Sequence, residues 1–382
     1  MQPIRALGTM SGTSLDGVDA AELVTDGETI AGFGAAAYIP YDDAQRAVLR
    51  AALGRWPGEP GVPEASEVVE TQAARLLARF EAPEVIGFHG QTLAHAPEDR
   101  RTHQAGDGAL LAELTGVPVA WDFRTADVAL GGEGAPLAPA FHHACARWMG
   151  ARRPLAFLNL GGVGNLTWVD PREADPAAAL LAFDTGPANA PLNDICQDWL
   201  GKPFDEDGQL AAEGTARDDL VAELLRAPFF ARVPPKSLDR DAFRAAGAAI
   251  DALPPSDAAA TWVAVIAASV AQALLHCPVA PARLLVAGGG RLNPEIMRAL
   301  ARAVPCPVAP VEDAGLDGDM LEAQAFAFLA VRVLRGLPTS FPSTTGVAAS
   351  VGGGTVSRPE GSGAPRPAHA RHRRGPRLEG AR

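Results

Sequence analysis

The sequence has few lysines, cysteines and tyrosines for a chain of 382 residues. Lys202 and Lys236 are its lysines, and it has only four cysteines and two tyrosines. The cysteines are far apart and form no C-x-x-C pair, so neither a disulfide framework nor a zinc site is indicated. Four reduced thiols are typical of a cytoplasmic protein, and we expect the chain in that compartment.

Net positive charge and a targeting segment are also missing. The formal net charge is −12, which argues against general nucleic-acid binding. The N-terminus lacks the basic and then apolar pattern of a signal peptide. The most apolar stretch, residues 258–276, has about the length of a membrane span, but it is rich in alanine and contains Gln272. We therefore expect a buried core helix there, and no membrane partner.

The organisation of the chain indicates two α/β domains. The length exceeds what one hydrophobic core usually serves. Apolar strand patterns ending in polar clusters alternate with helical patterns. The strands are expected at 84–92, 117–124, 154–170 (two strands around a turn), 179–186 and 283–290, and helices at 42–53, at 66–80 with Ser66 as N-cap, and at 317–336. Glycine-rich hairpins open both halves, which predicts a duplicated domain around a cleft.

The first hairpin contains the stretch GTMSGTSLDGVDAA, residues 8–21. Its glycines let the backbone approach a ligand and turn N–H groups toward an anion, and Thr13 and Ser14 add hydroxyl donors. Asp16 and Asp19 suit a phosphate site only if Mg²⁺ accompanies the phosphate. An ordinary hairpin turn explains the composition about equally well. Which of the two aspartates serves a metal stays open.

Two further glycine-rich turns strengthen the phosphate interpretation. In NLGGVGNLT (159–167), Gly161 and Gly162 can hold phosphates from an opposite wall. In VAGGGRLN (286–293), Gly288 and Gly289 lie between a strand and a helix, where a nucleotide can contact the helix N-terminus. The combination of turns indicates a nucleotide site better than any single turn.

Two acids and one arginine are candidates for chemistry. Asp184, in FDTGPANAPLND, ends a strand and can act as a general base, although a turn-capping role is also open. Glu322 lies at the start of a helix as a cleft-facing acid, or as part of a capping box with Asp319. Arg124 can bind an anionic group or sugar oxygens.

The stretch GFHGQT supplies two more candidates. His89 and Gln91 end a strand, and we expect them to contact substrate. A structural histidine at position 89 is the alternative.

Over residues 4–347 these stretches resemble the anhydro-N-acetylmuramic acid kinase family, in the family's order. The motifs are GTMSGTSLDGVDAA, GFHGQT, DFRTADVALGGEGAPLAP, NLGGVGNLT, FDTGPANAPLND, PPKSLDRDAF, AGGGRLN and LEAQAFAFLA. The resemblance implies the two-domain fold of the sugar kinase, Hsp70 and actin superfamily, with ATP and Mg²⁺ between the domains and a homodimer. We place domain I at 1–128 plus 325–347, domain II at 129–324, and a disordered Arg/Gly/Pro-rich tail at 348–382.

The resemblance also implies an activity in peptidoglycan recycling. Such an enzyme opens the 1,6-anhydro bridge of 1,6-anhydro-N-acetylmuramic acid and phosphorylates O6, giving N-acetylmuramic acid 6-phosphate and ADP. Asp184 matches the base that activates water, Arg124 and Glu322 match positions near the sugar, and Asp16 is the candidate metal ligand. The residues matching the ATP-phosphate loop are Gly12, Thr13, Ser14, Leu15, Asp16, Gly17, Val18 and Asp19.

The chain departs from the family pattern at a few places. Glu133 stands where glutamine is expected, Ala188 where glycine is more usual, and PPKSLDRDAF lacks the usual Thr-Gly after its serine. Another sugar kinase of the superfamily and a non-catalytic sugar or nucleotide sensor are the alternatives. A Rossmann dehydrogenase is a weaker one, because the glycine fingerprint has no acidic partner about 20 residues on.

Overall fold

The computed structural model describes residues 1–239 and 242–360, and these contain two β-sheets. Sheet A has seven strands: β1 (Ile4–Ser11), β2 (Gly17–Thr25), β3 (Ile30–Pro40), β4 (Val85–Ala96), β5 (Arg101–Ala105), β6 (Val119–Trp121) and β12 (Thr355–Ser357). Sheet B has five: β7 (Leu155–Leu160), β8 (Val163–Val169), β9 (Leu180–Pro187), β10 (Leu284–Ala287) and β11 (Val308–Pro310).

The two sheets repeat one topology. In sheet A, β1, β2 and β3 form an antiparallel meander, and β4 and then β6 extend it in parallel from β1. In sheet B, β7, β8 and β9 form the meander, and β10 and then β11 extend it in parallel from β7. This confirms the prediction of a duplicated α/β domain and agrees with the two-domain fold that the family resemblance implies.

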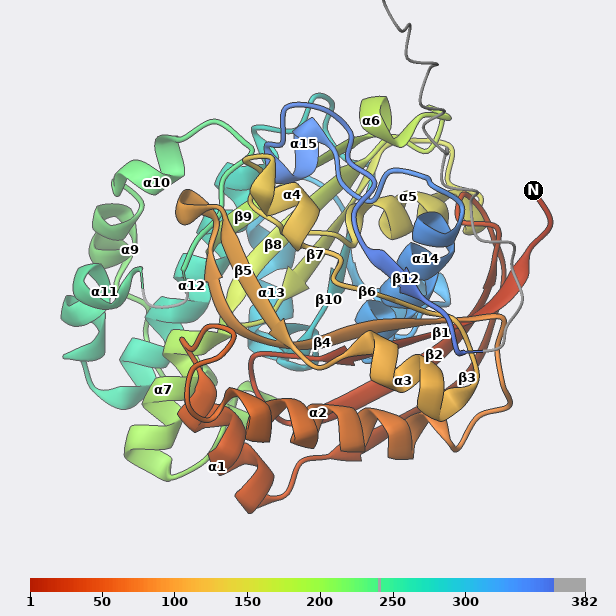
Figure 1. Cartoon of the computed structure of the whole chain (residues 1–382). Helices are drawn as coiled ribbons and strands as arrows, with labels where there is room; N and C mark the ends of the chain where they lie inside the picture. The colour runs from red at the N-terminus through yellow and green to blue at the C-terminus, as the bar shows by residue number, and fades with distance from the viewer. Residues whose placement is uncertain (240–241, 361–382) are drawn as a thin grey trace, which may run out of the picture.

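Helices separate and cover the sheets in layers (Figure 1). α1 and α2 pack on the outer face of sheet A, α14 and α5 lie between the sheets, and α12 and α13 cover sheet B. The shorter helices α7 to α11 pack beside α12. The helices are α1 (Asp43–Ala52), α2 (Val62–Leu77), α3 (Gly108–Thr115), α4 (Thr125–Ala129), α5 (Pro139–Trp148), α6 (Pro176–Ala179), α7 (Asn189–Leu200), α8 (Gln209–Ala212), α9 (Asp218–Leu224), α10 (Pro228–Ala231), α11 (Arg244–Asp251), α12 (Pro255–Leu274), α13 (Pro294–Ala303), α14 (Leu321–Leu334) and α15 (Pro342–Thr345).

Glycines in sheet A allow α14 to lie directly on the strands. A β-carbon at Gly8 would be 2.0 Å from the carbonyl oxygen of Ala323, and one at Gly87 would be 2.1 Å from that of Phe326. Both obstacles are backbone atoms of α14, which cannot move without the helix. The close packing fixes the first turn of α14, where Glu322 lies.

The apolar segment at 258–276 is a core helix, as predicted. By length and composition α12 could cross a membrane, but 67% of its most apolar window is buried inside the protein. Its residues contact sheet B on one side and the group α7 to α11 on the other.

Two helix starts differ from the prediction. α2 begins at Val62 and not at Ser66, because Gly61 adopts a left-handed conformation and Pro63 suits the first turn. The capping box at Asp319 and Glu322 is absent: Met320 is the N-cap of α14, and the Asp319 carboxylate accepts instead from Arg291 at 2.8 Å.

The prediction of a disordered tail from residue 348 is wrong for residues 348–360. β12 pairs with β6, the Gly353 N–H donates to Thr339 Oγ1 at 2.9 Å, and Trp121 Nε1 donates to Ser357 Oγ at 3.0 Å. Composition misled here, because a segment of small residues can complete a sheet edge through backbone pairing and a few hydrogen bonds that involve side chains. The rest of the predicted tail, 361–382, lies outside the described residues, and the domain boundaries at 128/129 and 324/325 stay predictions.

Candidate active site

A buried glutamine on β4 holds the loop after β1 in place. Ser11 Oγ donates to Gln91 Oε1 at 2.6 Å, and Gln91 Nε2 donates to the carbonyl oxygens of Gly12 and Thr92. Tyr41 Oη lies 3.0 Å from Ser11 Oγ. Because Gln91 is fully buried, its side chain supports the loop, and the structure does not place it where a substrate could touch it.

The tip of this loop presents polar groups to solvent. Thr13, Ser14 and Asp16 are exposed, while Leu15 and Val18 bury their side chains. Leu15 has a φ of 59°, and its burial anchors the turn. Only the backbone of these two apolar residues can therefore face a ligand.

Asp19, on β2, belongs to an acidic group near the start of α14. Burial raises its pKa to about 7, and the charges of Glu322 and Asp319 add to the rise. A half-buried carboxyl with this proton affinity favours a nearby cation or a shared proton.

A β-bulge positions His89. The pairing of β1 with β4 shifts between Thr9 and Ser11, where His89 and Gly90 of β4 lie opposite the single residue Met10 of β1. Gly90 has a φ of 72°, and a β-carbon there would be 2.5 Å from the Ala105 carbonyl oxygen. The bulge directs the buried imidazole of His89 against the ring of Phe326, 4.6 Å away between centroids.

His89 in turn orients Arg124. His89 Nδ1 donates to the Gly90 carbonyl at 2.9 Å, so Nε2 is free to accept from Arg124 Nη2 at 3.0 Å. Burial and the positive charge of Arg124 lower the pKa of His89 to about 3, which keeps the imidazole neutral. Arg124 Nη1 also donates to the Gly134 carbonyl at 2.8 Å. Burial lowers the Arg124 pKa to about 10, while Glu322 and Asp127 oppose the decrease, so it stays a cation at neutral pH.

Glu322 joins the two halves of the site. Asn159, at the end of β7, donates from Nδ2 to Glu322 Oε1 at 3.2 Å. Although Glu322 is solvent-exposed as a residue, the surrounding protein desolvates its carboxyl group and so raises its pKa. The charge of Arg124 and the hydrogen bond from Asn159 oppose that rise.

The glycine-rich turns of sheet B lie against one another. A β-carbon at Gly288 would be 2.3 Å from Asn159 Oδ1, and its φ is 71°. Asn189 holds the first of these turns: its N–H donates to the Gly161 carbonyl at 2.9 Å and its Nδ2 to the Leu160 carbonyl at 2.8 Å. Gly162 and Gly289 are exposed, so both turns offer accessible backbone.

Asp184 lies opposite Asn165 because Thr185 forms a bulge in β9. Asn165 Nδ2 donates to Asp184 Oδ1 at 2.8 Å, and the Leu238 N–H donates to Oδ2 at 2.8 Å. Burial raises the Asp184 pKa, these two hydrogen bonds oppose the rise, and the charge of Glu133 adds to it. The resulting pKa is about 6. The group is thus ionised at neutral pH and retains enough basicity to accept a proton.

The sequence interpretation missed a buried acid that organises the site. Asp127 is 1% exposed and accepts from the Gly134 N–H at 2.7 Å and from Ser340 Oγ and Thr345 Oγ1. It thereby fixes Gly134, whose carbonyl receives Arg124. The sequence signal that could have pointed to Asp127 is its position three residues after Arg124. Asn159, next to the Gly-Gly turn, was missed in the same way.

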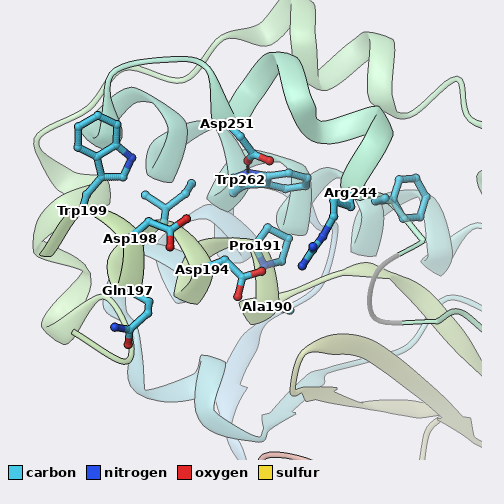
Figure 2. Close-up of a pocket in the computed structure, with 11 residues that line it drawn as sticks. Ala190, Pro191, Asp194, Gln197, Asp198, Trp199, Arg244, Asp251 and Trp262 are labelled. Atoms are coloured by element: carbon cyan, nitrogen blue, oxygen red, sulfur yellow. Dashed lines mark hydrogen bonds between the residues drawn. The ribbon is translucent and has the colours of Figure 1, made fainter. Parts of the chain in front are cut away.

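A separate cavity of about 490 Å³ opens between α7, α11 and α12 (Figure 2). Trp262 Nε1 donates to Asp251 Oδ1 at 2.9 Å in its wall. None of the predicted site residues lines it. Its lining residues are Ala190, Pro191, Asp194, Ile195, Gln197, Asp198, Trp199, Phe243, Arg244, Asp251 and Trp262.

Backbone turns from both sheets, an arginine held as a cation and a basic carboxylate define a site of the phosphotransferase class, with features of a sugar kinase. A sequence model of the anhydro-N-acetylmuramic acid kinase family matches residues 4–358, and the chain belongs to this family.

Individual relatives agree over most of their length. An anhydro-N-acetylmuramic acid kinase of Cereibacter sphaeroides is 64% identical over 93% of this chain and 96% of its own. One of Roseobacter denitrificans is 62% identical over 94% of this chain and 95% of its own. Among solved structures, a ligand-bound xylulose kinase from Lactobacillus acidophilus aligns with a TM-score of 0.43 at 11% identity, covering 93% of this chain and 94% of that one.

Proposed function

We propose that this protein uses ATP to open the 1,6-anhydro bridge of 1,6-anhydro-N-acetylmuramic acid and to phosphorylate O6. The products are N-acetylmuramic acid 6-phosphate and ADP, as in peptidoglycan recycling. The observation that carries the proposal is Asp184: a half-buried carboxylate, fixed through both oxygens, with a pKa near 6. The identity of the substrate is inferred from family membership.

In the proposed reaction Asp184 acts as the general base. It takes a proton from a water molecule whose oxygen attacks the anomeric carbon, C1. The bond from C1 to O6 breaks, O6 bonds to the γ-phosphorus of ATP, and ADP leaves. The proton on Asp184 then passes to solvent, so water and a phosphoryl group are both added to the sugar.

Other residues bind and orient the substrates. We assign the ATP phosphates to the backbone of the loop from Gly12 to Asp19 and to the turns at Gly161–Gly162 and Gly288–Gly289. Arg124 and Glu322 contact the sugar, and His89 acts by holding Arg124. The short polar contacts among these groups support positioning as the main source of rate enhancement.

The acidic group also suits Mg²⁺. Asp16 and the half-buried Asp19 supply oxygen donors. Burial raises the Asp19 pKa, and the negative charges of Glu322 and Asp319 add to the rise. Within residues 1–239 and 242–360, no cluster of three or more His, Cys, Asp or Glu side chains forms a complete metal cage. Mg²⁺ commonly uses one or two carboxylates plus substrate phosphates, so we assign it to Asp16, with Asp19 nearby. When bound it would neutralise phosphate charge.

We further propose a cytoplasmic homodimer. The four cysteines are free thiols, which supports a reducing compartment. Trp199 and Leu200 at the end of α7, and Phe204 just after it, are exposed apolar side chains that suit a subunit contact.

Substitution of the base tests the catalytic assignment. Asp184→Asn removes the proton acceptor and leaves the glycine-rich loops intact, so sugar-dependent ADP release should fall by at least about a thousandfold. Calorimetric titration with an ATP analogue should give an unchanged affinity.

Two results would contradict this assignment. Retained turnover would show that another group activates water, and lost nucleotide affinity would place Asp184 in the nucleotide site. If wild-type protein binds the sugar but releases no ADP, the sensor alternative is favoured, and turnover of other sugars alone favours a different sugar kinase.

A further inference from the structure

The segment Lys236–Ser237–Leu238 lies against the proposed base. The Asp184 N–H donates to the Lys236 carbonyl at 2.9 Å, and the Leu238 N–H donates to Asp184 Oδ2 at 2.8 Å. The segment thus fixes both the backbone of Asp184 and one of its carboxylate oxygens. Any shift of the segment would move that oxygen.

One end of this segment is anchored in the core. The Lys236 side chain is buried, and its Nζ donates to the Phe229 carbonyl at 3.2 Å. Nζ also lies 4.6 Å from the centre of the Phe229 ring, a cation–π contact. Displacing Lys236 would break both of these contacts, so its side chain anchors the segment.

The middle of the segment is tied to a different part of the chain. Ser237 is exposed, and its Oγ donates to Glu133 Oε2 at 2.8 Å. Glu133 is itself fixed: its N–H donates to the Thr345 carbonyl at 2.7 Å, and its carbonyl accepts from His95 Nε2 at 2.9 Å. The loop that carries Glu133 continues to Gly134, whose carbonyl oxygen accepts a hydrogen bond from Arg124.

We propose that Glu133 and Ser237 are positioning residues, and that their hydrogen bond holds the segment 236–238 against Asp184. This inference rests on the proposed function of Asp184 as the base. The contact connects the Asp184 carboxylate to the loop whose Gly134 carbonyl binds Arg124. The proposed base and the proposed sugar-binding arginine are therefore held at a fixed distance from each other.

Glu133 has a second, separable effect. Its negative charge raises the pKa of Asp184, whereas the Ser237 hydroxyl carries no charge. Loss of the hydrogen bond should lower the rate, and loss of the charge should shift the pH dependence. A merely structural contact would do only the first.

The test is the pH profile of turnover with Mg-ATP and the anhydro sugar for a set of variants. Ser237→Ala should lower kcat by about tenfold or more with the KM for ATP unchanged, and Ser237→Thr should restore it. Glu133→Gln keeps an acceptor for Ser237, so its kcat should fall less. In the Glu133→Gln variant, the midpoint of the acid limb of kcat/KM should lie at a lower pH than in the wild type, where it is expected near pH 6. The reason is that the ionised Asp184 loses a negatively charged neighbour.

Glu98→Gln is the matched control, since Glu98 lines the same cavity of about 460 Å³ as Glu133 and Ser237. It should leave the acid limb in place. The proposal is overturned if Glu133→Gln leaves the acid limb unmoved, or if Ser237→Ala and Ser237→Thr have the same kcat.

A second readout separates this proposal from the proposed function. NMR titration of ¹³C-labelled aspartate carboxyls, with Asp184→Asn for assignment, follows the ionisation of Asp184 without turnover. A lower midpoint in Glu133→Gln supports the contact even if wild-type protein does not turn over the sugar. An unchanged midpoint overturns it even if the reaction is confirmed.

Discussion

At the residue scale, burial decides which polar side chains of the site can exchange protons. His89 is held neutral and donates to a backbone carbonyl, so it directs Arg124 and takes no part in proton transfer. Asp184 has a pKa of about 6, which makes it the group suited to accept a proton near neutral pH. On the proposed mechanism, activity should therefore decrease as the pH falls through about 6, because protonation of Asp184 removes the proposed base.

Asp127 offers a test at this scale. Asp127→Ala leaves the Gly134 N–H and the hydroxyls of Ser340 and Thr345 without their acceptor. Buried donors without partners cost about 1–3 kcal/mol each, so the free energy of unfolding should fall by about 3 kcal/mol or more. Urea unfolding measures the loss, with Ser340→Ala as a control that should cost less. A loss below about 1 kcal/mol would show that water satisfies these groups.

Part of the site could be predicted from residue types. Residue type and position made Asp184 and Arg124 candidates, the family motifs gave them their roles, and these roles stay predictions. The support that Gln91 gives to the first loop could not be predicted, since it depends on the register of β4 against β1. The contact between Ser237 and Glu133 joins segments more than one hundred residues apart, and no local pattern marks it.

At the element scale, α14 determines the position of Glu322 relative to sheet A. Its first turn carries Glu322, and its backbone rests on Gly8 and Gly87. The apolar pattern of residues 84–92 predicted the strand that carries Gly87. The start of α14 could not be predicted from its capping pattern, because Arg291 draws the Asp319 carboxylate away from the helix.

Gly87→Ala tests the seating of α14. The new methyl group would be 2.1 Å from the Phe326 carbonyl oxygen, so the helix must shift, at a cost of about 1–3 kcal/mol in unfolding free energy. Gly32→Ala in β3, where nothing lies within 4 Å, is the control and should be nearly neutral. Thermal unfolding of both variants gives the comparison. Equal melting temperatures would mean that the helix yields without strain.

At the scale of the whole molecule, the doubled sheet places the parts of the site on opposite halves. Sheet A supplies the first loop, while sheet B supplies Asp184 and two glycine-rich turns. The repeat could be predicted from the two glycine-rich hairpins. The completion of sheet A by β12 could not, because its three residues follow a run of glycines with no strand signal.

The central claim is that water and the γ-phosphoryl group of ATP are added to one sugar in one reaction. The most direct measurement is mass spectrometry of the product formed from Mg-ATP and 1,6-anhydro-N-acetylmuramic acid in water labelled with oxygen-18. The account predicts sugar-dependent ADP release and a product that carries one phosphate and one oxygen-18 atom, with the label at C1. A phosphorylated product with the anhydro bridge intact, or ADP release that does not need the sugar, would contradict it.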